Sequence, residues 1–200
     1  VQVTTVPKLI DEGYLVKPRV FAPYVPDMHS VKTLAGDYNP KQLEEAMNTS
    51  KLVGDILKHW EKYAADRSTA LFASGITHSI DIASTFGKRG HNIEHIDGTT
   101  DKGKRDDIVA AMDSGDLQLV TNVGVLTEGW DCPRCSCVVM ARPTKSLGLY
   151  LQVAGRILRP FPGKEDAMIL DHAGNTLRHG FVTDDFNWQL RTEDGGVKKK

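Results

Sequence analysis

The feature that most constrains the fold of this chain is a regular alternation of short apolar runs with amphipathic stretches. The apolar runs predict strands at 69–74, 92–97, 117–121, 136–141 and 167–171. Between the strands, helical spacing predicts a helix over 77–90, with Thr77 as its cap and Gly90 as its terminator, and another over 101–115. A third helix is predicted to stop at Pro160. Strands and helices in this rhythm favour an α/β domain in which helices cover both faces of a mainly parallel sheet.

The first 40 residues lack this pattern and are rich in proline. Pro18, Pro23 and Pro26 fall within nine positions. Proline fixes its own backbone and biases the residue before it toward extended geometry. Residues 1–40 are therefore predicted to form an extended connector without a core of its own.

The pattern changes at Asn39, which is a possible N-cap. Pro40 follows at the first helical position, and apolar residues recur at helical spacing as far as Trp60. This stretch predicts one long helix or two abutting helices. The domain itself is predicted over residues 41–181, and residues 182–200, where periodicity is lost, are predicted to be a tail.

Composition indicates a globular protein without a strong overall charge. The hydrophobic fraction is 40%, the charged fraction is 26% and the formal net charge is −1, so any site for a polyanion has to be local. No apolar run approaches the roughly 20 residues of a membrane-spanning helix, and the first residues do not resemble a signal peptide. The odd number of cysteines, three, is a poor disulfide framework. These features predict a reduced, cytoplasmic protein.

One segment of the third predicted helix, YLQVAGRILRP, carries an unusual polar stripe. On a helical wheel Gln152, Arg156 and Arg159 fall opposite Leu147, while apolar residues crowd most of the rest. A solvated face of a surface helix is the alternative explanation for such a stripe. The apolar surroundings and the choice of arginine, whose planar fork suits phosphate, favour a phosphate-binding site.

A second segment, VTNVGVLTEGWDCP, follows the predicted strand at 117–121. Ligands bind at the carboxyl ends of parallel strands, where Thr121 and Asn122 could donate hydrogen bonds. Further along, Gly129 lets the chain approach a ligand closely beside Asp131. The alternative is a simple crossover with a glycine turn.

Together these segments resemble the second RecA-like lobe of superfamily 2 helicases and translocases. The resemblance rests on QVAGRILRP for motif VI, TNVGVLTEGWDCP for motif V and ALFASGITHS (70–79) for motif IV, in the family's order. Residues 95–120 follow the stretch that joins motifs IV and V. The segments before and after motif VI are most similar to the RadD-like and restriction-enzyme helicase-subunit branch. The resemblance implies a RecA-like three-layer α/β/α domain.

The resemblance also implies a nucleotide site shared with another lobe. ATP with Mg²⁺ would lie between two RecA-like lobes, and Arg156 and Arg159 would reach the γ-phosphate, one of them as the arginine finger. Such guanidinium groups stabilise the charge that spreads over transferring phosphoryl oxygens. Gln152 would position the attacking water or sense the phosphate. Asp131 would accept hydrogen bonds from the ribose hydroxyls, and Gly129 would give the room.

The resemblance further implies contacts with the phosphates of one nucleic-acid strand. The residues that match these contacts are Ser74, Gly75, Thr99, Thr121 and Asn122. Phosphate contacts provide grip without sequence information and give salt-sensitive binding. The branch favours DNA over RNA. Whether strands are separated, and in which direction the lobe would move, stays open.

The other half of such a motor has no counterpart in this chain. No G-x4-G-K-[ST] loop occurs, the nearest fragment being FPGKED, and no DEAD-type acidic box is present. Hydrolysis requires the P-loop lysine, the Mg²⁺ ligands and the arginines together. The chain is therefore predicted to be a lobe of a longer enzyme, inactive as an ATPase alone, with residues 1–40 following the first lobe.

The main alternative function is that of a RecA-like module that binds nucleic acid or protein without nucleotide chemistry. A Rossmann or flavodoxin-like enzyme is disfavoured because no G-x-G-x-x-G turn follows a strand. Cys132 and Cys135 lack a second pair for zinc, so no metal site is predicted. The basic cluster 102–107 is predicted to be a solvated helix start, and Trp130 either packs or stacks on a base.

Overall fold

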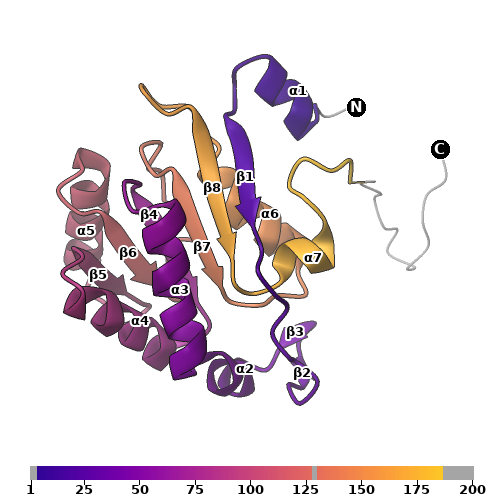
Figure 1. Cartoon of the computed structure of the whole chain (residues 1–200), viewed down its shortest axis with the longest axis vertical. Helices are drawn as coiled ribbons and strands as arrows, with labels where there is room; N and C mark the ends of the chain where they lie inside the picture. The colour runs from indigo at the N-terminus through magenta and orange to yellow at the C-terminus, as the bar shows by residue number, and fades with distance from the viewer. Residues whose placement is uncertain (1–3, 128–129, 187–200) are drawn as a thin grey trace.

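The computed structural model describes residues 4–127 and 130–186 (Figure 1). Its strands are β1 (Lys17–Phe21), β2 (Thr33–Leu34), β3 (Asp37–Tyr38), β4 (Thr69–Ala73), β5 (Ile93–Ile96), β6 (Leu119–Asn122), β7 (Cys137–Ala141) and β8 (Asp166–Asp171). Its helices are α1 (Val6–Asp11), α2 (Pro40–Met47), α3 (Ser50–Tyr63), α4 (Ile76–Lys88), α5 (Lys102–Ser114), α6 (Leu147–Arg156) and α7 (Asn175–His179). None of these helices is long and apolar enough to cross a membrane.

Six strands form one parallel sheet in the order β1-β8-β7-β4-β6-β5. The four inner strands are almost wholly buried, which explains why their sequences read as continuous apolar runs. β2 and β3 form a separate antiparallel pair. The parallel strands bring all their carboxyl ends to one edge of the sheet, which lies at the bottom of Figure 1 beside α2 and the β2–β3 hairpin.

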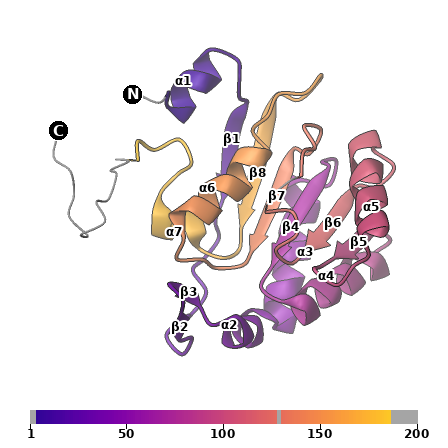
Figure 2. The ribbon, with the colours of Figure 1, turned by 180° about the vertical axis from the view of Figure 1, so that it is seen from behind.

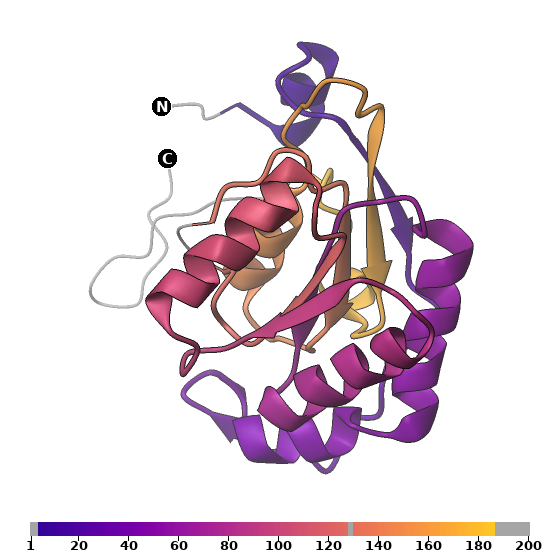
Figure 3. The ribbon, with the colours of Figure 1, turned by 90° about the vertical axis from the view of Figure 1, so that its left-hand side faces the viewer.

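Helices cover both faces of the sheet. α3 and α4 lie on one face, and Figure 2, which shows the molecule from behind, has α6 and α7 in front of the other face. Figure 3 shows α5 on the opposite side of the sheet from α3 and α4. The two faces have separate cores, one around Trp60, Ile82 and Phe86, and the other around Met112 and Tyr150. The predicted three-layer RecA-like α/β/α fold is confirmed.

The structure corrects the prediction for residues 1–40. They are not an extended connector throughout, because β1 pairs with β8 over the whole length of the strand, with Pro18 opposite Ala167. β1 is an edge strand, and proline is tolerated there because an edge strand does not need every N–H for pairing. The helix α1 precedes it and is capped by Thr5.

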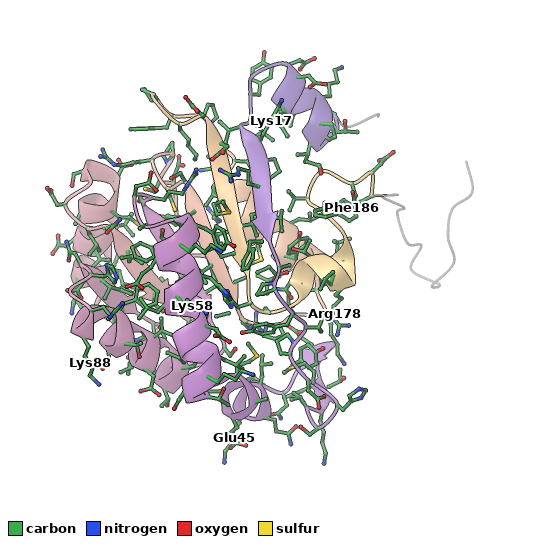
Figure 4. All side chains as sticks on the ribbon, viewed as in Figure 1. Lys17, Glu45, Lys58, Lys88, Arg178 and Phe186 are labelled. Carbon is green, nitrogen blue, oxygen red and sulfur yellow. The ribbon has the colours of Figure 1, made fainter. Side chains whose placement is uncertain are left out.

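Residues 28–47 form a small unit at the carboxyl edge of the sheet. Val31, Tyr38, Leu43 and Met47 bury their side chains together. The unit is held to the main domain by the Tyr38 hydroxyl, which accepts a hydrogen bond of 2.6 Å from Arg178. Figure 4 shows Arg178 on α7 beside the hairpin. The carboxyl edge, where ligands bind in such sheets, is therefore partly covered by this unit.

Asp37 provides the second attachment of this unit. Its carboxylate accepts hydrogen bonds from the Thr144 hydroxyl at 2.9 Å and the Lys145 amide at 2.8 Å, and it pairs with Arg142 at 3.2 Å. Although burial opposes ionisation, the backbone hydrogen bonds and these neighbours give Asp37 a net lowered pKa. The carboxylate is therefore held in its charged form against the loop that follows β7.

Of the two alternatives for the stretch after Asn39, the structure has two helices, because Thr49 caps a second helix by accepting from the Leu52 amide. Two other details of the helices differ from the predictions. The N-cap of α4 is Gly75 and not Thr77. α6 ends at Arg156, so Arg159 lies in the turn beyond it.

The predicted tail also begins inside the fold. Val182 is buried in the core between the sheet and α6, with 2% of its surface exposed. The later part of that prediction, 187–200, lies outside the described residues.

Buried histidines make the stability of this fold depend on pH. Burial lowers the pKa of His172 to about 3 and that of His78 to about 4, from 6.5. Below pH 6.5 the unfolded chain binds protons that the folded chain does not, so stability is full above this pH and declines as the pH falls toward 4. We expect a lower midpoint of urea unfolding at pH 5 than at pH 7.5, and a smaller difference in His172→Gln. Equal midpoints at both pH values would contradict this explanation.

Candidate nucleotide and nucleic-acid sites

The helix α6 carries the polar stripe from the carboxyl edge of the sheet toward its amino ends. Ser146 caps the helix by accepting from the Leu149 amide at 3.2 Å, and Tyr150, Val153 and Ala154 bury the face that packs on the sheet. Just past the helix, the carbonyl of residue 158 accepts a hydrogen bond of 2.8 Å from the amide that precedes β1. The end of the stripe is therefore fixed beside the amino end of the sheet.

Arg156 holds the loop of motif V. Its guanidinium donates to the Thr127 carbonyl from Nε at 3.1 Å and from Nη2 at 2.6 Å, and it also donates to the Trp130 carbonyl. A planar fork with several donors is suited to binding two carbonyls at once. Arg156 thus ties α6 to the loop that contains the predicted ribose contact.

Arg159 forms an exposed ion pair with Asp131. Its side chain is 42% exposed and that of Asp131 is 68% exposed, so both groups are accessible from solvent. Gln152 is also exposed and lies one helical turn before Arg156, on the same side of α6. These four predicted residues therefore belong to one region of the surface, while Gly129 lies outside the described residues.

Lys164 fixes the backbone at Arg159, a contact that the sequence did not predict. Its ammonium group donates to the carbonyls of Pro133 at 2.9 Å, Cys135 at 2.7 Å and Arg159 at 2.8 Å. Burial lowers the pKa of this amine to about 8. In the sequence this lysine belongs to FPGKED, the nearest fragment to a P-loop but without its hydroxyl and first glycine, and in the structure it binds the backbone carbonyls that surround it.

Thr121 and Asn122 lie at the carboxyl end of β6, as predicted, but their side chains are fully buried. The Thr121 hydroxyl is 2.8 Å from that of Ser79. The Asn122 amide donates to the Leu71 carbonyl at 2.9 Å and accepts from the Leu126 amide at 3.2 Å. These two side chains were expected to donate directly to a phosphate. Because β6 is buried on both faces, they instead form hydrogen bonds with neighbouring segments of the fold.

Ser74 and Gly75 lie at the next strand end and lead into α4. The Ser74 hydroxyl donates to the Ala141 carbonyl at 2.8 Å and is buried. The carboxylate of Glu44, from α2, packs against Gly75 and accepts a hydrogen bond of 3.1 Å from the His78 amide. A negative group is favourable at a helix N-terminus, so Glu44 takes the position that a strand phosphate would need.

Thr99 is exposed in the loop that follows β5. Its amide and its hydroxyl both donate to one carboxylate oxygen of Asp97, each at 2.7 Å. The hydrogen bonds from Thr99 and from His95 lower the pKa of Asp97 to about 2. A phosphate at Thr99 would therefore have to replace an ionised carboxylate or bind other groups of this loop.

The three cysteines are buried single thiols. Burial raises the pKa of Cys132 to about 11, that of Cys137 to about 12 and that of Cys135 further still, so none is a ready thiolate. Among the described residues no group of three or more His, Cys, Asp or Glu side chains is arranged to hold a metal. Trp130 is 4% exposed and packs in the core with α6, which favours packing over base stacking.

The two sets of predicted residues lie at different places on the domain. Ser74, Gly75, Thr99, Thr121 and Asn122 gather at the carboxyl edge of the sheet, whereas the nucleotide set surrounds the far end of α6. The loop between β6 and β7 connects them. It is bound at its start by the side chain of Asn122 and at its later part by Arg156. This loop is the physical link between the two regions.

Comparisons with known proteins show the family of this chain. Residues 48–160 match the family described as the helicase conserved C-terminal domain. A 51.5 kDa protein of a Lactococcus phage is 30% identical over 193 residues, which cover 94% of this chain and 42% of that protein. IRC3 of Saccharomyces cerevisiae, whose name places it among the ATP-dependent helicases, is 30% identical over 171 residues, or 84% of this chain and 25% of IRC3.

The fold has a similar counterpart among solved structures. A fragment of an HsdR-type subunit of a type I restriction enzyme from Vibrio vulnificus superposes with a TM-score of 0.68 at 19% identity, covering 87% of this chain and 35% of that one. The chain thus spans less than half the length of these relatives. Since the family match covers more than half of its residues, the chain belongs to the helicase conserved C-terminal domain family.

Proposed function

We propose that this chain is the C-terminal motor lobe of an ATP-dependent superfamily 2 DNA helicase or translocase that acts in the cytoplasm. In the complete protein it supplies an arginine finger and contacts with one nucleic-acid strand. A neighbouring N-terminal RecA-like lobe supplies most of the nucleotide site. The observation that carries the proposal is the accessible Arg159–Asp131 pair at the end of α6.

The contacts of the two arginines support different tasks for them. Arg156 is committed to the carbonyls of Thr127 and Trp130, so it positions the motif V loop. Arg159 is the finger, because its partner Asp131 is itself exposed. An exposed ion pair contributes only about 0–1 kcal/mol, so a phosphate can take the place of the Asp131 carboxylate at little cost.

These residues fit ATP as a substrate bound mainly elsewhere. Asp131, once released from Arg159, can accept hydrogen bonds from ribose hydroxyls. Gln152 is exposed and can hold a water molecule or sense the γ-phosphate. Arg159 stabilises the charge that develops on the transferring phosphoryl group. Mg²⁺ would be held by acidic residues of the first lobe and by the phosphates, where it neutralises negative charge.

DNA would bind at the carboxyl edge of the sheet. Here the exposed loop around Thr99 would bind phosphate through groups other than those held by Asp97, and the N-terminus of α4 at Gly75 would offer backbone donors once the Glu44 carboxylate gives way. Ser74, Thr121 and Asn122 would act by shaping this edge from inside the fold. Binding to phosphates alone would be insensitive to sequence and would weaken with salt.

An ATPase assay with the isolated chain and with the complete protein tests this assignment. The isolated chain is expected to show no hydrolysis above background, with or without DNA, because it has no P-loop lysine and no acidic box. The complete protein is expected to hydrolyse ATP and to be stimulated by DNA. DNA-stimulated turnover by the isolated chain would contradict the proposal. Binding of DNA by a complete protein that never hydrolyses ATP would support the alternative, a non-catalytic RecA-like binding module.

A further inference from the structure

A continuous chain of hydrogen bonds connects β6, α4 and β5. The Thr121 hydroxyl lies 2.8 Å from the Ser79 hydroxyl, which lies 2.7 Å from Nδ1 of His95. On the other side of the ring, Nε2 of His95 lies 3.0 Å from a carboxylate oxygen of Asp97. Thr121, Ser79 and Asp97 are buried, with at most 5% of their surfaces exposed. We call these four side chains, Thr121, Ser79, His95 and Asp97, the relay.

The direction of the hydrogen bonds in the relay follows from its ionised end. The Asp97 carboxylate can only accept, so Nε2 of His95 carries a proton and donates to it. With a neutral ring, Nδ1 then has to accept from the Ser79 hydroxyl. The Ser79 oxygen is left to accept from Thr121. Each donor has one acceptor, and the relay is fully satisfied.

A serine, a histidine and an aspartate in this order are also the components of a hydrolase triad. That reading fails here because Ser79 has no exposed surface. Its hydroxyl also already contacts both His95 and Thr121, so a substrate carbonyl cannot approach it. The relay therefore sets the relative positions of the segments that it joins.

The relay joins the three segments that carry the predicted strand contacts. Ser79 belongs to the first turn of α4, where its amide bonds to the Gly75 carbonyl at 3.0 Å. Thr121 directly precedes Asn122 at the start of the motif V loop. The second carboxylate oxygen of Asp97 holds the amide and the hydroxyl of Thr99. In this chain of contacts, His95 connects α4 and the end of β6 to the loop around Thr99.

Resting on the function proposed above, we propose that His95 is a positioning residue for nucleic-acid binding. Through Ser79 and Asp97 it fixes the loop around Thr99 relative to the N-terminus of α4 and the end of β6. The backbone donors along the carboxyl edge are then held in one arrangement for binding the phosphates of one strand. Loss of the contact between His95 and Ser79, or of the contact between His95 and Asp97, lets the Thr99 loop shift. The phosphate contacts made by the loop then weaken.

Two substitutions separate the contact of His95 with Ser79 from its contact with Asp97. His95→Asn keeps an amide near the position of Nδ1 and can retain the contact with Ser79, whereas His95→Gln reaches toward Asp97. Thr121→Val is a third variant that conserves shape and removes only the first hydroxyl. The matched control is His91→Asn, since His91 also pairs with a carboxylate, that of Glu61 at 3.1 Å, but outside the relay.

The measurement is DNA-stimulated ATP hydrolysis by the complete protein, with the DNA concentration varied at fixed salt. In the His95 variants we expect the DNA concentration for half-maximal stimulation to rise about tenfold, the equivalent of one hydrogen bond to a charged group. Thr121→Val is expected to give a smaller rise. The KM for ATP and kcat at saturating DNA are expected to stay within about twofold, which general damage to the fold would not allow. His91→Asn should behave as wild type.

The possible outcomes distinguish the two proposals. A wild-type protein that neither binds DNA nor responds to it would overturn the proposed function and this inference with it. A DNA-stimulated wild type with unchanged half-maximal concentrations in both His95 variants and in Thr121→Val would overturn this inference alone. Losses of kcat and of DNA response in equal proportion, together with a lowered Tm, would show that the relay serves only stability and would also overturn it.

Discussion

Replacing Arg159 by alanine in the complete protein is expected to reduce kcat for ATP hydrolysis by about 10³–10⁵-fold, the range found for arginine fingers. Binding of ATP should change much less, because most contacts to the nucleotide would come from the other lobe. DNA binding should also persist, since Arg159 lies near the amino end of the sheet and the strand contacts lie at the carboxyl edge. Steady-state ATPase kinetics with saturating DNA measure the effect.

Two further arginine variants control for the loss of charge. Arg19→Ala removes an exposed arginine whose ion pair, with Asp166 at 3.5 Å, is separate from that of Arg159 with Asp131, and kcat should be unchanged. Arg159→Lys keeps the charge without the planar fork and is expected to recover only part of the activity. If Arg159→Ala retained more than about a tenth of wild-type kcat, far above the range for such residues, the assignment of the finger would be wrong.

Truncating Trp60 to alanine is expected to lower the free energy of unfolding by about 3–5 kcal/mol. The indole is fully buried between α3 and the sheet. It contacts the ring of Phe86 at 5.4 Å between centroids, and its N–H donates to the Thr69 hydroxyl at 2.9 Å. Alanine would leave a large cavity and remove the hydrogen bond that the Thr69 hydroxyl accepts, although this hydroxyl still donates to the Arg67 carbonyl at 2.9 Å. Chemical denaturation of the 200-residue chain measures this change in the free energy of unfolding.

Two variants separate the contributions of Trp60. Trp60→Phe keeps most of the apolar volume and loses the hydrogen bond, so it should cost clearly less than alanine. Tyr14→Ala is the surface control, because Tyr14 is 66% exposed and should change stability by no more than about 0.5 kcal/mol. A loss below about 1 kcal/mol in Trp60→Ala would mean that this face of the sheet is not packed as described.

The inner sheet and its helices were predictable because their periodicity is a local property. The buried strands read as apolar runs, and Asn39 with Pro40 indicates a helix start without any tertiary information. β1 was missed for the opposite reason. Pro18 argues against a strand locally, and only the pairing with β8, more than 140 positions later, makes one of this segment.

The candidate site was predictable only in part. The residue types on α6 indicate a phosphate-binding site, and their spacing places Gln152 and Arg156 on one side of the helix. The sequence could not show that Arg156 binds the loop while Arg159 stays accessible, since both depend on the positions of Thr127, Trp130 and Asp131. The same is true of Glu44 at Gly75, a contact made across the domain by a residue without a motif.

The partners of the buried polar residues at the carboxyl edge could not be predicted either. Thr121 and Asn122 were expected to face a ligand because they end a strand. A strand that is covered on both faces turns its side chains into the layers of helices or toward neighbouring loops, and there they bind partners within the fold. Which partner each one finds is decided by packing and leaves no signal in a single sequence.

In the proposed motor, Arg159 leaves Asp131 and completes a nucleotide site on the neighbouring lobe. The decisive experiment is a structure of the complete protein with DNA, ADP and a metal fluoride that mimics the γ-phosphate. We expect the Arg159 guanidinium at hydrogen-bonding distance, about 2.7–3.2 Å, from the fluoride group, with Asp131 turned toward the ribose. A closed, DNA-bound structure in which Arg159 still pairs with Asp131 and points away from the nucleotide would contradict this proposal.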